Sequence, residues 1–144
     1  MAKNSTFYAV SGFNQFGANI SPTETTVAQT LHTASAEGCI IKALNISSND
    51  AAILYMELSI VDDSANIFVL GTFPIPITAG QSATGAVPSV NALDSTNIVG
   101  IEQDIQGNNI IKLAPLWLLK ARMIATVTAG DQVDILGSYE SITV

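Results

Sequence analysis

The chain has 144 residues, of which 48% are hydrophobic and only 12% are charged, and its formal net charge is −7 at pH 7. This length predicts one domain, and no apolar run reaches the ~20 residues of a membrane span. Five basic residues against twelve acidic ones cannot build a phosphate-binding face, so nucleic acid and an anionic membrane surface are not expected partners. So few charges predict a soluble protein whose surfaces are covered by other subunits, and therefore a homo-oligomer.

Residues 1–26 are predicted to form an extended N-terminal arm that ends at a break around Pro22. The arm shows no helical or strand periodicity, so it is not expected to build a core of its own. Its aromatic rings must therefore be buried elsewhere, either back on the parent domain or on a neighbouring protein. Four residues carry this partner-binding hypothesis: Phe7, Tyr8, Phe13 and Phe16.

From residue 27 onward, short apolar runs alternate with turn residues and predict about eight β-strands. The clearest is Ile53–Val61, in which every second residue is apolar, as in a half-buried strand. Within Cys39–Ser47 we expect Ile40, Leu44 and Ile46 to share one face. The other expected strands are Val27–Thr33, Ile67–Phe73, Asn109–Leu119, Lys120–Thr128 and Gln132–Ile142.

Short polar segments predict the turns between these strands. Ser48–Asp50 has small side chains that cap their own backbone, and Asp62–Asn66 is typical of a hairpin loop. Thr78–Gln81 and Thr128–Asp131 are nearly identical, and each is expected to place its glycine at a positive φ. Pro74 and Pro76 cannot donate to a β-ladder, so the end of the strand Ile67–Phe73 is expected either at a sheet edge or where the chain leaves the sheet.

Residues 82–109 are predicted to form a long inserted loop, because glycine, serine, asparagine and proline separate their scattered apolar residues. A loop of this length inside one domain is usually functional or bound to a partner. The remaining pattern predicts an all-β fold, an antiparallel β-sandwich over residues 27–144, with the N-terminal arm outside it. A jelly roll is one arrangement of this class that fits the strand spacing.

Residue types that carry catalysis or bind metals are sparse. His32 is the only histidine and Cys39 the only cysteine, so one subunit cannot supply a zinc site of these ligands. His32 is expected on a strand surface, with a metal site between symmetric copies or a small hydrolase as the alternatives. Asp62 and Asp63 suit either a solvated turn or a calcium ion. No catalytic or phosphate-binding motif is present, so neither an enzyme nor a cofactor is expected.

Trp117 is the only tryptophan, and it lies within an apolar run that begins at Pro115. Such a residue either packs into the core or remains exposed as an anchor for a partner. Under the second reading, Trp117 joins the arm aromatics as a candidate contact to another protein.

The order of certain segments adds a resemblance to a known family. These segments are Thr26–Leu31, Ile41–Ser47, the hairpin around Asp62-Asp63, Pro76–Gly80 and Asp134–Glu140. In them the chain resembles the small β-sandwich virion proteins of tailed bacteriophages. Residues 82–109 depart from that pattern as an insertion.

This resemblance implies a structural role in a phage particle. The family includes capsid decoration, or cement, proteins, which clamp neighbouring capsomers on the exterior of the head. The expected function is therefore decoration of the capsid, with the major capsid protein or other virion proteins as partners. The alternative is a tail or fibre module that binds a receptor or carbohydrate, for example through Trp117 or Tyr55.

Overall fold

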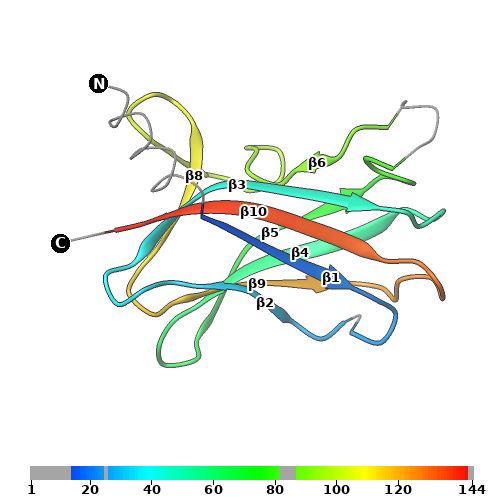
Figure 1. Ribbon diagram of the computed structural model, residues 1–144, viewed down its shortest axis with the longest axis horizontal. Coiled ribbons are helices and arrows are strands. Elements are labelled where there is room, and N and C mark those ends of the chain that lie inside the picture. Colours follow the sequence, from blue (N-terminus) through cyan, green and yellow to red (C-terminus); the bar gives the residue numbers. More distant parts are fainter. Residues whose placement is uncertain (1–13, 25, 82–86, 143–144) are drawn as a thin grey trace, which may run out of the picture.

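The computed structural model describes residues 14–24, 26–81 and 87–142. These residues form ten β-strands in two antiparallel sheets, which confirms the all-β prediction (Figure 1). The described part of the chain has no helix, and thus none that is long and apolar enough to cross a membrane.

The larger sheet has six strands in the order β1-β10-β3-β8-β7, and β6 pairs with β3 beside that path. Strands from both ends of the chain therefore lie side by side, because β10 pairs with β1 on one edge and β3 on the other (Figure 1). The strands of this sheet are β1 (Gln15–Ile20), β3 (Cys39–Ser48), β6 (Val90–Asn91), β7 (Glu102–Gln103), β8 (Asn109–Leu113) and β10 (Val133–Ser141).

The smaller sheet has four strands in the order β2-β9-β4-β5. Its outer strand β5 pairs only with β4 and contains Pro74, which confirms the expected edge position. The strands of this sheet are β2 (Gln29–Thr33), β4 (Leu54–Val61), β5 (Ile67–Ile75) and β9 (Leu118–Met123).

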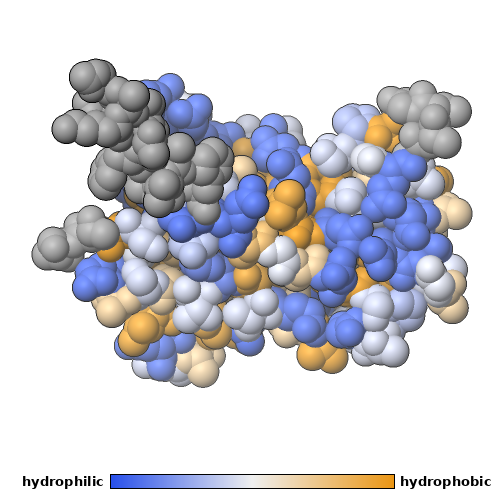
Figure 2. Space-filling view, viewed as in Figure 1, coloured by the Kyte–Doolittle hydropathy of each residue, from blue (hydrophilic) through white to orange (hydrophobic). Residues whose placement is uncertain are grey.

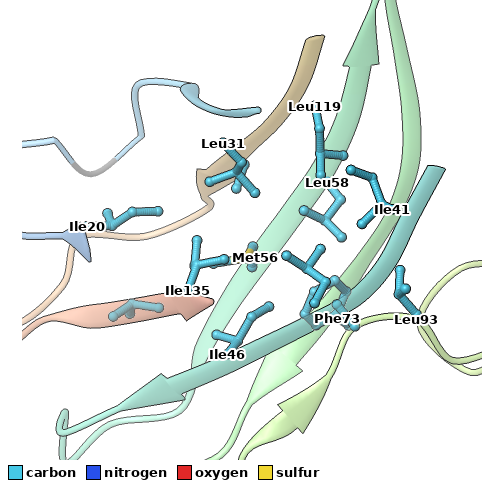
Figure 3. Packing of buried hydrophobic residues seen from close by; sticks show 14 of the residues in the cluster. Ile20, Leu31, Ile41, Ile46, Met56, Leu58, Phe73, Leu93, Leu119 and Ile135 are labelled. Atoms are coloured by element: carbon cyan, nitrogen blue, oxygen red, sulfur yellow. The ribbon is translucent and has the colours of Figure 1, made fainter. Parts of the chain in front are cut away.

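The hydrophobic core lies between the two sheets, whose inward side chains point toward one another (Figure 3). The alternation expected in β4 is confirmed as far as Leu58, because Met56 and Leu58 are fully buried whereas Tyr55 is exposed; beyond it the expectation is wrong, since Ser59 is buried and Ile60 only partly so. Full burial of an apolar side chain of this size stabilises a fold by ~1.5–3 kcal/mol. The six-stranded sheet contributes Ile41, Ile46 and Ile135, and the four-stranded sheet contributes Leu31, Phe73 and Leu119.

One expected face is corrected by a β-bulge in β3. Tyr139 pairs with Ile41 and Ser138 pairs with Ala43, so Lys42 is an extra residue without a partner in β10. The extra residue shifts the alternation by one position. As a result Ile41, and not Ile40, shares the buried face with Leu44 and Ile46.

The expected turns have the predicted backbone. Gly80 and Gly130 both have positive φ, at 74° and 88°. In the β4–β5 hairpin, a carboxylate oxygen of Asp62 accepts hydrogen bonds from the N–H groups of Ser64 and Asn66, at 2.9 and 2.8 Å. A solvated turn therefore accounts for this carboxylate.

The structure differs from the expected boundary of the N-terminal arm. Gln15–Ile20 form β1, an edge strand of the six-stranded sheet, and Ile20 is fully buried. The glycine and asparagine residues that obscured the strand pattern alternate outward along β1, while Phe16, Ala18 and Ile20 face the core. The sheet therefore includes part of what the sequence assigned to the arm.

The expected inserted loop also contributes to the fold. Its described part, residues 87–109, contains β6 and β7 and reaches the first residue of β8. Ala92, Leu93 and Ile98 from this segment are buried in the core. A second boundary also shifts: Asn109–Leu119 was expected as one strand, but β8 ends at Leu113 and β9 begins at Leu118. Leu116, with a φ of 65°, lies in the turn between them.

Candidate functional site

The four arm aromatics cannot all be placed. Phe7, Tyr8 and Phe13 lie outside the described residues, so their contact with a partner stays a prediction. Phe16 lies in β1 and is half-buried against the hydrophobic core. For this ring, burial on its own domain is the observed arrangement.

Phe16 fits over a residue that has no side chain. It pairs with Gly137 of β10, and a Cβ atom added to Gly137 would lie 2.2 Å from Cζ of the Phe16 ring. The centroid of that ring lies 5.3 Å from the His32 ring, which in turn lies 4.0 Å from the ring of Tyr139. These rings join β1 and β10 of one sheet to β2, the edge strand of the other.

His32 lies inside this aromatic cluster and not on an open strand surface. Its Nε2 atom is buried and has no hydrogen-bond partner among the described residues. Burial lowers the pKa of the imidazole below its ordinary value of 6.5, because the charged form loses hydration. The hydrolase alternative requires a nucleophile within hydrogen-bond reach of the ring, and the described residues supply none to Nε2.

The lowered pKa of His32 predicts a loss of stability in mild acid. The neutral ring stabilises the fold fully above pH 6.5, and this contribution falls as the pH drops through 6.5 toward the lower folded-state pKa. We expect the melting temperature to fall between pH 7.5 and 5, and the fall to be smaller in His32→Phe. Thermal unfolding followed by circular dichroism measures both effects.

Since His32 is the only histidine, its ring protons give an unambiguous NMR titration. Phe16→Leu is the control for altered packing. It loosens the same aromatic cluster as His32→Phe does, but it keeps the imidazole that titrates. A measured His32 pKa at or above 6.5 in the folded protein would contradict the prediction.

Trp117 lies near the surface at one end of the two sheets. It is half-buried, it packs against the core, and its ring stacks on Phe68 with centroids 5.9 Å apart and planes 8° from parallel. Phe68 is 47% exposed on the edge strand β5. Packing into the core is thus observed for part of the Trp117 side chain, and its role as an anchor for a partner stays a prediction.

The sequence did not single out that surface, which we call the apolar edge and define as Ile67, Phe68, Val69 and Trp117. Ile67 and Val69 are 67% and 57% exposed, and no residue of β5 is charged. Monomeric proteins usually protect such an edge with lysine, proline or a bulge. β5 has a bulge at Leu70 and a proline at Pro74, so both devices lie beyond the apolar edge. The signal available in the sequence was that the strand Ile67–Ile75 contains no charged residue.

A groove of about 270 Å³ continues from the apolar edge. Its wall is formed by Val69 and Leu70 of β5 and by Val99 and Ile101 from the segment before β7. Val99 is 91% exposed. An exposed apolar surface with a groove is typical of a protein contact site.

The opposite character is found at the other end of the molecule. Hydrophilic residues gather over the right-hand ends of β1, β3 and β10 (Figure 2). Asp134 lies there and accepts hydrogen bonds from the side-chain amides of Asn19, Gln81 (3.2 Å) and Gln132 (2.9 Å). These bonds satisfy the carboxylate, so this end has the character of a solvated surface.

Two further candidates for chemistry are the thiol of Cys39 and a metal site. Cys39 is buried in β3, and burial raises the pKa of its thiol to about 11, which keeps the reactive thiolate scarce. Across residues 14–24, 26–81 and 87–142, no three His, Cys, Asp or Glu side chains are grouped as a metal site would require. Comparison of the chain with protein-family models, curated proteins and solved structures gives no match.

Proposed function

We propose that this chain is a structural protein of a bacteriophage virion, a capsid decoration protein that bridges capsomers on the exterior of the head. The major capsid protein is the proposed partner, and the working form is a homo-oligomer. The proposal combines the sequence resemblance with a surface that suits assembly. The proposed role involves no catalysis and no binding of a cofactor or of nucleic acid.

We infer that the eight longer strands form a jelly roll. Their antiparallel pairs are nested, with β4–β5 innermost, followed by β3–β8, β2–β9 and β1–β10. A long hairpin of four nested pairs, rolled so that alternate pairs lie in opposite sheets, gives this connectivity. Jelly rolls are frequent in viral capsid proteins and in lectins. The topology supports a virion role only by analogy of fold, and the apolar edge supports it more specifically.

The apolar edge is the observation that carries the proposal. Ile67, Phe68 and Val69 expose apolar side chains on a strand whose outer backbone edge is unpaired in the described part of the chain. A second protein can cover both features at once by adding a strand and burying the side chains. Tryptophan is enriched among the residues that dominate such interfaces, and Trp117 stacks beneath Phe68.

The mechanism is added buried area at the seams between capsomers. Each Å² of apolar surface removed from water contributes ~25 cal/mol, and a stable interface buries ~800 Å² on each partner. Repetition of one contact over a whole shell multiplies a modest local gain. In this proposal the arm aromatics Phe7, Tyr8 and Phe13 add anchors to the contact that the apolar edge makes.

Binding to phage heads that lack the protein tests the proposal directly. We expect the purified chain to sediment with such heads, and Val69→Lys to weaken binding at least tenfold because a charge would be buried without a partner. Val27→Lys is the matched control, since Val27 is similarly exposed, at 61%, but lies outside the apolar edge. Quantitative co-sedimentation over a range of protein concentrations gives both affinities.

Deletion of residues 2–13 tests the arm separately, because it removes three aromatics and leaves β1 intact. Failure of the intact protein to bind heads contradicts the decoration role. Equal binding by Val69→Lys and Val27→Lys contradicts the role of the apolar edge, and undiminished binding after the deletion contradicts the role of the arm.

A further inference from the structure

A hollow of about 550 Å³ opens among residues of β3, β6, β7 and β8 in the six-stranded sheet. This volume is within the ~300–1,000 Å³ range of small-ligand sites. Its lining is dominated by carboxamide side chains, which come from separate parts of the chain. They are Asn45, Asn91, Gln103, Asn108 and Asn109.

Internal hydrogen bonds already fix four of these carboxamides, among them Asn108, whose Nδ2 donates to the carboxylate of Asp104 at 3.2 Å. Asn91 Oδ1 accepts from the N–H of Leu93 at 3.1 Å, and Asn109 Nδ2 donates to the Leu93 carbonyl at 2.8 Å. Gln103 Nε2 donates to Asn109 Oδ1 at 3.2 Å. Among the described residues nothing bonds the amide hydrogens of Asn91 or the Oε1 atom of Gln103, so a ligand would meet free groups on side chains that are already held in place.

Asn45 completes the arrangement with a carboxamide that makes no hydrogen bond to the rest of the described chain. It pairs in register with Asn91 on one side and with Leu136 on the other. Leu136 is 56% exposed, so an apolar surface borders the polar groups. This combination of donors, acceptors and a small apolar surface matches a sugar, whose ring carbons carry both hydroxyl groups and apolar C–H bonds.

The charges around the hollow do not favour an anionic ligand. Lys42 lines it but lies 3.5 Å from the carboxylate of Glu140, which offsets the positive charge. Asp104, whose carboxylate accepts from Asn108 at 3.2 Å, adds a second negative group nearby. Phosphate, sulfate and acidic sugars therefore lack the net positive charge that would attract them.

We propose that this hollow is a binding site for a neutral glycan, with Asn45, Asn91 and Gln103 as the residues that contact its hydroxyl groups. The site is separate from the apolar edge, so a decoration protein seated on a head could keep it open to solution. The inference does not depend on the decoration role, because it rests on the hollow alone.

Glycan binding is tested with the purified full chain. We expect it to bind neutral oligosaccharides of glucose, galactose, mannose or N-acetylglucosamine on an array, in preference to sialylated or uronic-acid glycans. Saturation-transfer NMR with a bound neutral trisaccharide then gives the dissociation constant. Asn45→Ala is expected to weaken binding about threefold to tenfold, because it removes hydrogen bonds to the ligand without breaking internal ones.

Gln106→Ala is the matched control, since Gln106 lies in the neighbouring loop but does not line the hollow. Circular dichroism checks that both variants fold. Absence of binding to every neutral glycan at ~10 mM, well above the ~1 mM typical of weak sites, would overturn the proposal. Equal binding by Asn45→Ala and the control, or capture of extended peptides in place of glycans, would overturn it too.

Discussion

Gly71→Ala is expected to lower the free energy of unfolding by about 2–3 kcal/mol, because no space exists for a methyl group at this position of β5. A Cβ atom built on Gly71 would lie 2.0 Å from the carbonyl oxygen of Asn97 and 3.1 Å from its carbonyl carbon. Those atoms belong to the backbone and cannot move aside as a flexible side chain would. The segment must shift as a whole, and the neighbouring Ile98 would then leave the core, where it is only 4% exposed.

Hydrogen bonds hold that segment in place and raise the cost of moving it. The N–H groups of Asn97 and Ile98 both donate to the Asp94 carbonyl, at 3.0 and 2.9 Å. The Asn97 side chain also donates to the carbonyl of Asn91 at 2.8 Å. The segment is therefore a fixed cover over β5, which a methyl group on Gly71 would strain.

Guanidinium unfolding at pH 7 measures the loss, and a fall of the melting temperature by ~5–10 °C accompanies it in a chain of this size. Gly17→Ala is the control, because a Cβ there would lie 3.4 Å from its nearest neighbour, an ordinary contact, and φ is not positive. Equal stability of Gly71→Ala and Gly17→Ala would show that the cover over β5 is not fixed.

Much of this fold follows from local sequence. The sequence alternates strictly from Leu54 to Ile60, so the position of β4 and its buried face as far as Leu58 were predictable. Gly80 and Gly130 each end a Thr-Ala-Gly sequence that follows a β-branched apolar residue, and their positive φ was predictable from turn chemistry alone. These features depend only on a residue and its neighbours in sequence.

The failures share a different cause, since each involves contacts between distant segments. Lys42 forms a bulge only because β10 skips it, which no pattern within β3 reveals. The residues of β1 were assigned to the arm because what holds them in the sheet is not local. Phe16 fits over Gly137 of β10, a residue far away in sequence. Gly71 in an apolar run did carry a usable signal, because glycine inside a strand often marks a close approach of another backbone.

The candidate sites show the same division. Trp117 could be selected as an anchor from its residue type. Its stacking on Phe68, however, depends on the turn between β8 and β9, where the sequence pattern predicted a continuous strand. The carboxamides of the hollow come from four strands and one loop, and each alone reads as an ordinary polar residue. They are brought together only by the pairing of β3 with β6 and β8 and of β8 with β7.

The two nearly identical turns acquire a common explanation from the structure. Asp50 accepts at its backbone carbonyl from the N–H of Thr78, and at its carboxylate from the N–H of Thr128, at 3.0 and 2.8 Å. Both turns therefore dock on one residue, and both close with glycine at a positive φ. Their shared geometry selects similar residues, so internal duplication is not needed to explain the similarity.

Asp50→Ala is accordingly expected to lower the free energy of unfolding by about 3–4 kcal/mol at pH 7. Asp50 is fully buried, and its carboxylate accepts from the N–H and hydroxyl groups of Thr128 and from the N–H of Ala52. Truncation leaves these donors without their partner. Asp63→Ala, at the exposed tip of the β4–β5 hairpin, is the control and should change stability by less than ~0.5 kcal/mol.

The dependence on pH separates loss of the charge from loss of packing. Burial by itself raises the pKa of Asp50, but the hydrogen bonds from Thr128 and Ala52 outweigh it and leave that pKa below its ordinary value of 3.8. The ionised form therefore stabilises the fold fully above pH 3.8, and this contribution is lost as the pH falls below 3.8. Guanidinium unfolding should then show that the stability gap between the wild-type protein and Asp50→Asn narrows between pH 5 and pH 2.5. A gap that stays constant over this range would mean that the charge of Asp50 contributes nothing, and that only its shape holds the two turns.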